Sequence, residues 1–396
     1  MKKVLKGLGT TVLALILAAV AIPYFFKDKL VARLKTELNN NLKARVDFKD
    51  VDVSIIRHFP RLTVGLEQLS ISSSEGFAND TLLQVHRFDA ALNLMSVLKG
   101  DAVQVHGIYL HRPVIQAVVA PDGRANWDIV KSSTEAADTG TTQEPLLLQL
   151  EQYAITDGVI RYTDAQSHMA LTVKDLNHTG SGDLGTDVFT LATTTAAQSV
   201  AFNYGGVDYI ADAAAGIDAQ IAVDMGKARY SFNKATIKLN NLEVATDGFV
   251  QLDNDSTYSM DLKFGATQQQ FKDLLSLVPA LYTKDFASLK TSGAASFNGW
   301  VKGIYSTTQL PAYDVAVQVQ NGFFQYPDLP QAVKNVQVDA RFANATGAAD
   351  AAVVEVKHAH LEMGNQPVDF KLLFRNPETV QYIDAVLKGN LNLAAL

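Results

Sequence analysis

The chain has 396 residues, of which 47% are hydrophobic and 19% are charged, and its formal net charge is −7. This acidic balance argues against a nucleic-acid-binding protein, which would need a basic face. The chain has no cysteine, which excludes disulfides, thiolate metal sites and cysteine nucleophiles. Soluble domains usually carry about 25% charged residues, so this chain has an unusually large amount of apolar surface to place.

The N-terminus has the pattern of a membrane anchor. Three lysines precede residues 7–26, which contain no charged residue. This run is long enough to cross the ~30 Å hydrocarbon core of a bilayer once. We therefore predict a transmembrane anchor at residues 1–27, with the leading lysines cytoplasmic and the rest of the chain exported. The anchor residues that we single out are Gly7, Leu13, Leu17, Phe25 and Phe26. The alternative is a cleaved signal peptide with Ala19-Val20-Ala21 as its processing site.

The remainder of the chain divides into four stretches. Residues 28–45 carry a leucine at every fourth position and predict an amphipathic helix. Residues 46–130 alternate apolar and polar side chains, which is the period of a half-buried strand. Residues 131–145 hold no aromatic or large aliphatic residue and predict a flexible linker or loop. Strand patterns return in residues 146–396, with one predicted helix near 268–278.

These patterns predict a mainly β protein with antiparallel strands and a few short helices. So few helices are predicted that they would not cover the sheets. The strands must therefore form a sandwich, close into a barrel, or leave an apolar face open. An open face of that size is stable in water only when something apolar occupies it. The sequence alone leaves all three arrangements open.

A glycine recurs at the centre of similar strand segments. Gly107, Gly158, Gly248 and Gly322 are each followed by two apolar residues, and the last three follow Asp or Asn. We interpret them as strand-entry glycines. We predict that at least two of the four occupy bulge or turn positions with positive φ, a conformation that glycine adopts at little cost.

No local motif indicates catalysis. Residues 180–185 match G-x-G-x-x-G, but a strand-like segment follows where a dinucleotide site needs a helix. His358 and His360 lie two apart on a predicted strand, and a surface pair is the simpler explanation than a metal site. We therefore predict no catalytic residue, no cofactor and no metal, and we do not expect an enzyme.

Several segments of the chain form a recognisable set. They are I-Y-L-H-R-P-V-I at 108–115, D-G-R-A-N-W at 122–127, F-N-G-W-V-K-G-I-Y at 297–305, L-P-A-Y-D-V at 310–315, N-G-F-F-Q-Y-P-D-L-P at 321–330 and L-K-G-N-L-N-L at 387–393. Together with the N-terminal anchor pattern, these segments resemble the AsmA family of bacterial envelope proteins. The chain is similar to the longer AsmA-like proteins of Bacteroidota, which are related to TamB and to the chorein-type bridge proteins. Because such proteins usually run longer, the resemblance implies that this chain corresponds to an N-terminal portion.

The resemblance implies a long, twisted, groove-forming antiparallel sheet that binds or transfers phospholipid between the inner and outer membranes. It also implies a single-pass inner-membrane protein whose bulk is periplasmic. The alternative is a non-transporting envelope scaffold that assists outer-membrane assembly by holding protein partners. In the lipid hypothesis, the groove is lined by residues of the alternating segments: Val51, Val53, Leu62, Val64, Leu92, Leu94, Val103, Val105, Ile108 and Leu110.

Overall fold

The structure is a computed structural model that describes residues 42–73, 77, 81–99, 104–129, 147–254, 256–275, 289–325, 331–364 and 366–389. The chain forms two compact units, Met1–Thr186 and Asp187–Leu396. The predicted linker at 131–145 and the predicted anchor residues lie outside the described residues. Within the described residues, no helix combines the length and the apolar character needed to span a bilayer.

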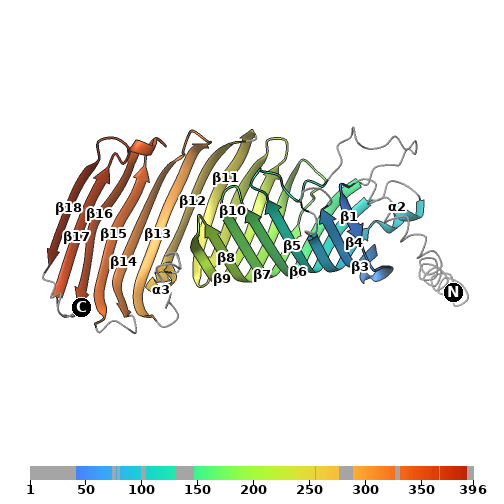
Figure 1. The fold of residues 1–396 in the computed structure, drawn as a ribbon, viewed down its shortest axis with the longest axis horizontal. Helices are drawn as coiled ribbons and strands as arrows, with labels where there is room; N and C mark the ends of the chain where they lie inside the picture. The colour runs from blue at the N-terminus through green and yellow to red at the C-terminus, as the bar shows by residue number, and fades with distance from the viewer. Residues whose placement is uncertain are drawn as a thin grey trace, which may run out of the picture. The chain divides into compact units, whose positions relative to one another are not determined.

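The described part of unit 1 is a set of strands with one short helix (Figure 1). Its elements are β1 (Ala44–Asp47), β2 (Asp50–His58), β3 (Arg61–Ser73), β4 (Thr81–Leu92), α2 (Leu94–Lys99), β5 (Gln104–Val119), β6 (Leu147–Asp164) and β7 (Met169–Ser181). Strand β3 pairs with β1 and β2 at different positions along its length, and β4 and β5 follow in antiparallel order. Strands β5 and β6 pair in parallel, which corrects the expectation of purely antiparallel pairing.

The described part of unit 2 is also built mainly of strands. Its elements are β8 (Val188–Tyr204), β9 (Val207–Asp224), β10 (Arg229–Leu239), β11 (Leu242–Asn254), β12 (Thr257–Gln270), α3 (Phe271–Leu275), β13 (Lys290–Tyr305), β14 (Ala312–Gln325), β15 (Val333–Asn344), the 3-10 turn η3 (Ala349–Ala351), β16 (Ala352–Met363), β17 (Gln366–Arg375) and β18 (Tyr382–Gly389). Each strand from β8 to β17 pairs antiparallel with the next. The prediction of a mainly β protein with few helices is confirmed.

Three predicted boundaries differ from the structure. Ala44 and Arg45, placed at the end of the predicted amphipathic helix, begin β1 instead. Residues 268–270, placed in the predicted helix, end strand β12, so α3 begins only at Phe271. Leu94, expected to continue the alternation of β4, begins α2. The Asn93 side chain explains why a helix begins at Leu94. Its Oδ1 accepts a hydrogen bond of 2.9 Å from the Met95 N–H, as a helix cap does.

The recurring glycines lie inside long strands and not at strand entries. Gly107, Gly158, Gly248 and Gly322 each lie at or beside a shift in register, so the expectation of a bulge is met. Only Gly248 has a positive φ, of 125°, so the prediction of two such glycines is wrong. Before two of the others the left-handed conformation falls on the preceding residue, at Asp157 and Asn321. Asp and Asn tolerate that conformation, so the adjacent glycine is not required to supply it.

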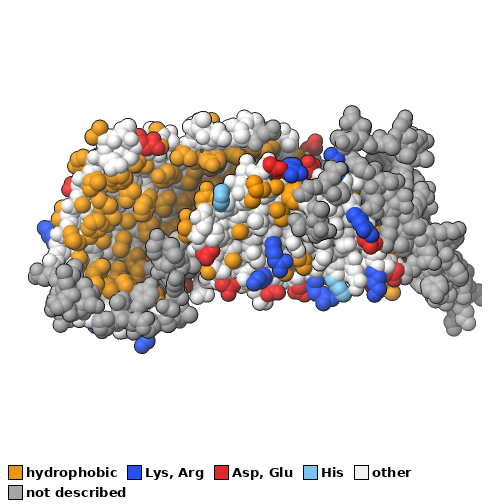
Figure 2. Space-filling model, viewed as in Figure 1, with side chains coloured by type: hydrophobic (Ala, Val, Ile, Leu, Met, Phe, Trp, Pro, Cys, Tyr) orange, Lys and Arg blue, Asp and Glu red, His pale blue; other side chains and the backbone are white. Residues whose placement is uncertain are grey.

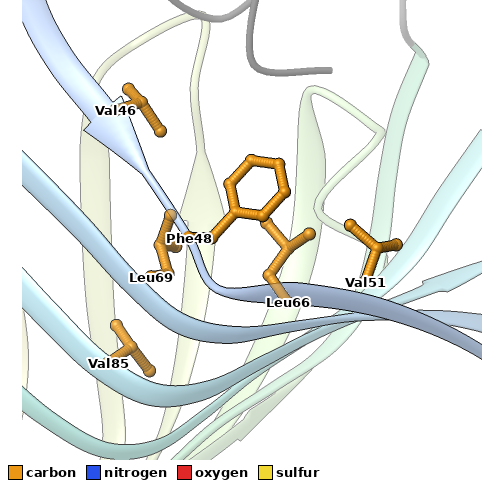
Figure 3. Close-up of a cluster of buried hydrophobic side chains, with 6 residues drawn as sticks. All are labelled: Val46, Phe48, Val51, Leu66, Leu69 and Val85. Carbon is orange, nitrogen blue, oxygen red and sulfur yellow. The ribbon is translucent and has the colours of Figure 1, made fainter. Parts of the chain in front are cut away.

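The main core of unit 1 forms where the chain passes from β1 into β2. Six buried side chains pack together there, as Figure 3 shows: Val46, Phe48, Val51, Leu66, Leu69 and Val85. Leu66 and Leu69 are three residues apart and still share this core, and Gln68 between them has a positive φ of 51°. The register with β4 is unchanged on both sides of Gln68, so the alternation changes phase there without an added residue.

Candidate functional site

The register of unit 1 places most of the predicted groove residues on one face, which we call the unit 1 apolar face. Cross-strand partners in an antiparallel pair point to the same side of a sheet. Three rows of partners connect β2, β3, β4 and β5 through the apolar positions. The rows are Val51–Leu66–Phe88–Leu110, Val53–Val64–Ala90–Ile108, and Leu62–Leu92–Val105. Val103 lies outside the described residues, and Leu94 belongs to α2.

Part of this face is already filled by the protein itself. Val51 is 2% exposed and belongs to the core around Phe48, against which Val64 and Leu110 also pack. Val105 is 5% exposed, whereas Leu62, Leu92 and Ile108 are partly exposed. The segment that carries Val46 and Phe48 thus covers one part of the unit 1 apolar face, and a ligand would have to contact the remainder.

A more extensive apolar surface lies in unit 2, where the sequence analysis named no site residue. Three rows of cross-strand partners run from β12 or β13 to β18 on one face. We call these side chains the unit 2 apolar face. The rows are Phe264–Gly299–Val315–Phe342–Val354–Phe374–Ile383, Ala266–Phe297–Val317–Ala340–Val356–Leu372–Ala385, and Ala295–Val319–Val338–Ala359–Phe370–Leu387. No side chain in these rows carries a charge or a hydrogen-bonding group.

Much of the unit 2 apolar face is open to solvent. Figure 2 shows hydrophobic side chains gathered in a hollowed surface over strands β13 to β18. Phe342 is 41% exposed and Ile383 is 62% exposed, while Leu372 and Phe374 are partly exposed. Full burial of one such side chain is worth about 1.5–3 kcal/mol. Covering a row of such half-exposed side chains with an apolar ligand would therefore be favourable in free energy.

One end of the unit 2 apolar face is closed by helix α3. Phe271 of α3 packs in a buried cluster with Ala295, Val319, Val333 and Val336. Ala295 and Val319 belong to the third row, so this row is sealed at the β13 and β14 positions and opens toward β18. Phe271 and Leu274 lie three residues apart, so both side chains are on the same side of α3 and contact this cluster.

The opposite face of unit 2 carries the charges. Arg341 Nε donates hydrogen bonds of 3.0 and 3.1 Å to the two carboxylate oxygens of Asp314, and this bond lowers the pKa of Asp314. Lys302 lies 2.8 Å from Asp261 on the same side. The two faces are therefore sharply different in polarity. The alternation of Val315, Val317 and Val319 with Ala316, Gln318 and Gln320 was the sequence signal for this segregation.

The opposite face of unit 1 holds a network of ion pairs. Arg87 lies 2.5 Å from Asp52 and 2.9 Å from Asp89, and Arg57 contacts the same two carboxylates. A polar cavity of about 470 Å³ lies over Arg57, Arg87 and Asp89. Gly65 makes the network possible, since a Cβ there would lie 2.2 Å from the Arg87 guanidinium. Arg57 and Arg87 are thus each paired with carboxylates of the same network, which reduces their capacity to bind an anion.

The described residues hold no cluster of three or more His, Asp or Glu side chains arranged to bind a metal. His358 and His360, the pair considered from the sequence, do not converge on such a cluster. His360 Nδ1 lies 2.9 Å from Asp369 Oδ1, and this hydrogen bond raises the pKa of His360. His360 is thus engaged in a local ion pair.

Long ladders of strands with one charged face and one partly exposed apolar face define a mainly β protein with an open apolar surface. A family model described as the AsmA family matches residues 1–291, and the chain belongs to the AsmA family. The family resemblance predicted from the sequence is thereby confirmed. Neither a curated protein nor a solved structure matches the chain.

Proposed function

We propose that this chain binds phospholipid through its acyl chains on the unit 2 apolar face. The proposal includes transfer of that lipid between the inner and outer membranes by a protein anchored through residues 7–26. The observation that carries it is the set of three apolar rows, which continue across as many as seven strands without a charged side chain. An acyl chain has no polar atoms that need a specific hydrogen-bond partner. Alternating apolar side chains along the strands, all on one face, are therefore sufficient to bind it.

The length of the rows supports a chain-like ligand. Neighbouring strands are about 4.8 Å apart, so a row that crosses seven strands extends roughly 29 Å. One leaflet accounts for about half of the ~30 Å hydrocarbon core of a bilayer, so a row is long enough to contact an extended acyl chain along its whole length. The partly exposed members of the unit 1 apolar face, including Leu62, Leu92 and Ile108, are proposed as further acyl contacts.

The competing hypothesis is an envelope scaffold in which protein partners cover the apolar face. A photoreactive side chain identifies the occupant in intact cells. We would place p-benzoylphenylalanine at Phe342 of the unit 2 apolar face, and at Trp300 of the charged face as a control. The two aromatic positions are matched in exposure, at 41% and 37%. Phospholipid adducts at position 342 and few or none at position 300 are expected. Protein adducts at position 342 would favour the scaffold.

A second comparison tests binding by mutation. Leu372 and Leu373 are adjacent in β17 and partly exposed, but they point to opposite faces. Leu372→Asp should strongly reduce the lipid that cross-links at position 342, because a carboxylate would be desolvated by an acyl chain. Leu373→Asp on the charged face should leave the adducts unchanged. Equal effects of the two substitutions, or no lipid adduct at all, would refute the proposed function.

A further inference from the structure

The turn between β2 and β3 exposes two large apolar side chains. Ile56 is 87% exposed and Phe59 is 77% exposed. Regular pairing of the two strands runs from Asp50 to Ser54 and then shifts, so residues 55–60 form an irregular end of the hairpin. We call these residues the β2–β3 tip. Because burial of such side chains is favourable, their exposure on one short turn calls for an explanation.

Polar side chains of the β2–β3 tip hold it against the sheet. Arg57 Nη1 lies 3.5 Å from Asp89 Oδ1 on β4, a carboxylate with no exposed surface. The His58 ring stacks on Tyr109 of β5 with 4.0 Å between the ring centroids, and its Nδ1 lies 3.1 Å from the buried Thr63 hydroxyl. Arg57 and His58 thus contact the protein, while the apolar residues on either side of them are exposed. This is the reverse of the arrangement that water favours, so the tip is suited to an apolar environment.

A third exposed apolar residue lies at the same end of the sheet. Strand β3 begins beside the tip, and its Leu62 pairs with Leu92 at the end of β4. Helix α2 begins two residues later, and its Met95 is 56% exposed. The segment 55–61 itself contains two arginines and one histidine but no acidic residue. Exposed apolar side chains among basic ones are typical of segments that lie at the surface of an anionic bilayer.

The sequence before β1 indicates which apolar environment is near. Residues 7–26 carry no charge and are long enough to cross a bilayer. Only residues 27–41 separate this run from Leu42, the first described residue. Even fully extended, these fifteen residues span only about 50 Å, so an anchor at residues 7–26 keeps unit 1 close to the bilayer. A lipid bilayer is therefore the apolar partner available to the tip.

We propose that the β2–β3 tip inserts Ile56 and Phe59 into the surface of the bilayer in which residues 7–26 are anchored. The proposal rests on the anchorage in the proposed function, but not on lipid binding by the unit 2 apolar face. The chain enters β1 at Ala44, which pairs with Ser73 at the end of β3 that is farther from the tip. A tether at one end of β3 and an inserted tip at the other fix the orientation of unit 1 on the bilayer.

A tryptophan reporter tests the insertion. The full chain with Trp127→Phe and Trp300→Phe has no native tryptophan left, so Phe59→Trp places a single apolar reporter at the tip. The chain would be reconstituted into vesicles of phosphatidylethanolamine and phosphatidylglycerol, with or without brominated acyl chains. Tyr204→Trp is the control, because Tyr204 is 51% exposed and lies at the turn between β8 and β9. We expect blue-shifted emission and strong quenching by brominated lipid at position 59, and little of either at position 204.

A charge substitution tests whether the apolar side chains drive the insertion. Ile56→Asp, added to the position 59 reporter, should lower the insertion equilibrium constant roughly tenfold or more, because the carboxylate would have to leave water. Val380→Asp is the matched control, since Val380 is 82% exposed and also lies in a turn. It should leave the quenching at position 59 unchanged. Circular dichroism establishes that each variant is folded.

Flotation of the vesicles reports the anchor separately from the tip. A chain that does not float with the vesicles would refute the anchorage and this inference together. A folded chain that floats but shows no quenching at position 59 would overturn only this inference, and a protein partner would then be the better explanation of the exposed tip. Equal quenching at positions 59 and 204, or an Ile56→Asp variant that is quenched like the original, would also overturn it.

Discussion

Arg87 Nε donates a 2.9 Å hydrogen bond to Oδ1 of Asp89, a residue two positions away on β4 whose side chain has no exposed surface. Arg57 Nη1 lies 3.5 Å from the same oxygen, and His111 Nε2 lies 3.9 Å from Oδ2. Asp89 therefore compensates two guanidinium groups on the charged face of unit 1. Because a buried charge without a partner is costly, this carboxylate is predicted to be a main determinant of unit 1 stability.

The first prediction is that Asp89→Asn destabilises unit 1 by about 2 kcal/mol. The cost should be below that of breaking a fully buried pair, because both arginines retain Asp52. The chain has two tryptophans, and Trp127 lies in unit 1 while Trp300 lies in unit 2. Denaturant unfolding followed by Trp127 fluorescence in a Trp300→Phe background would measure the change. Asp122→Asn, at an exposed pair with Arg124, should give no measurable change. Equal stability of the two variants would contradict this account.

The second prediction concerns Gly248, the recurring glycine that has a positive φ. A Cβ added there would lie 2.0 Å from the carbonyl oxygen of Asp261 on the neighbouring strand. Gly248→Ala should therefore cost about 3 kcal/mol or more, since it adds a backbone clash to a strained φ. Gly205→Ala is the control, because its φ is 58° with open space around the Cβ, and it should cost about 1 kcal/mol. Trp300 fluorescence in a Trp127→Phe background would report both. Similar destabilisation by Gly248→Ala and Gly205→Ala would show that the backbone shifts to relieve the clash with Asp261.

Much of the unit 1 apolar face could be predicted from the alternation of apolar and polar residues. A strand that buries one face places an apolar residue at every second position, as around Val64, Leu92 and Ile108. The phase change before Leu69 was visible in the sequence, and it falls at Gln68, whose φ is 51°. Phe48 continues the apolar alternation of Ala44 and Val46, although it lies in the bend between two strands. Its contacts depend on how β1 returns to pair with β3.

The unit 2 apolar face shows a different limit of sequence reasoning. Each strand segment, such as that of Val315, Val317 and Val319, was recognisable on its own. The continuity of the face depends on register across β12 to β18, which local patterns do not specify. The parallel pairing of β5 with β6 was likewise hidden, because nothing in the segment at 131–145 indicates the direction in which the chain returns.

The third prediction uses the raised pKa of His360. The hydrogen bond to Asp369 stabilises the charged imidazolium, so folding is favoured when His360 is protonated. This contribution is fully present below the unfolded pKa of about 6.5 and is lost as pH rises through the higher folded pKa. His360→Gln should therefore destabilise unit 2 more at pH 5 than at pH 9. Denaturant unfolding across this range, read by Trp300, would measure the difference. A penalty that is the same at both pH values would exclude the ion pair as its cause.

The last prediction concerns Phe48, which is 2% exposed and joins the segment after β1 to the core on β2, β3 and β4. Phe48→Ala would remove a buried ring and leave a cavity beside Val51 and Leu66. Such changes typically cost about 3–5 kcal/mol, and we expect the Trp127-monitored unfolding of unit 1 to shift by this amount. Ile56→Ala on β2 is the control, because Ile56 is 87% exposed, and its cost should stay within about 0.5 kcal/mol. If Phe48→Ala were as mild as the control, the segment before β2 would not close this part of the apolar face. Val51 would then be available to a ligand.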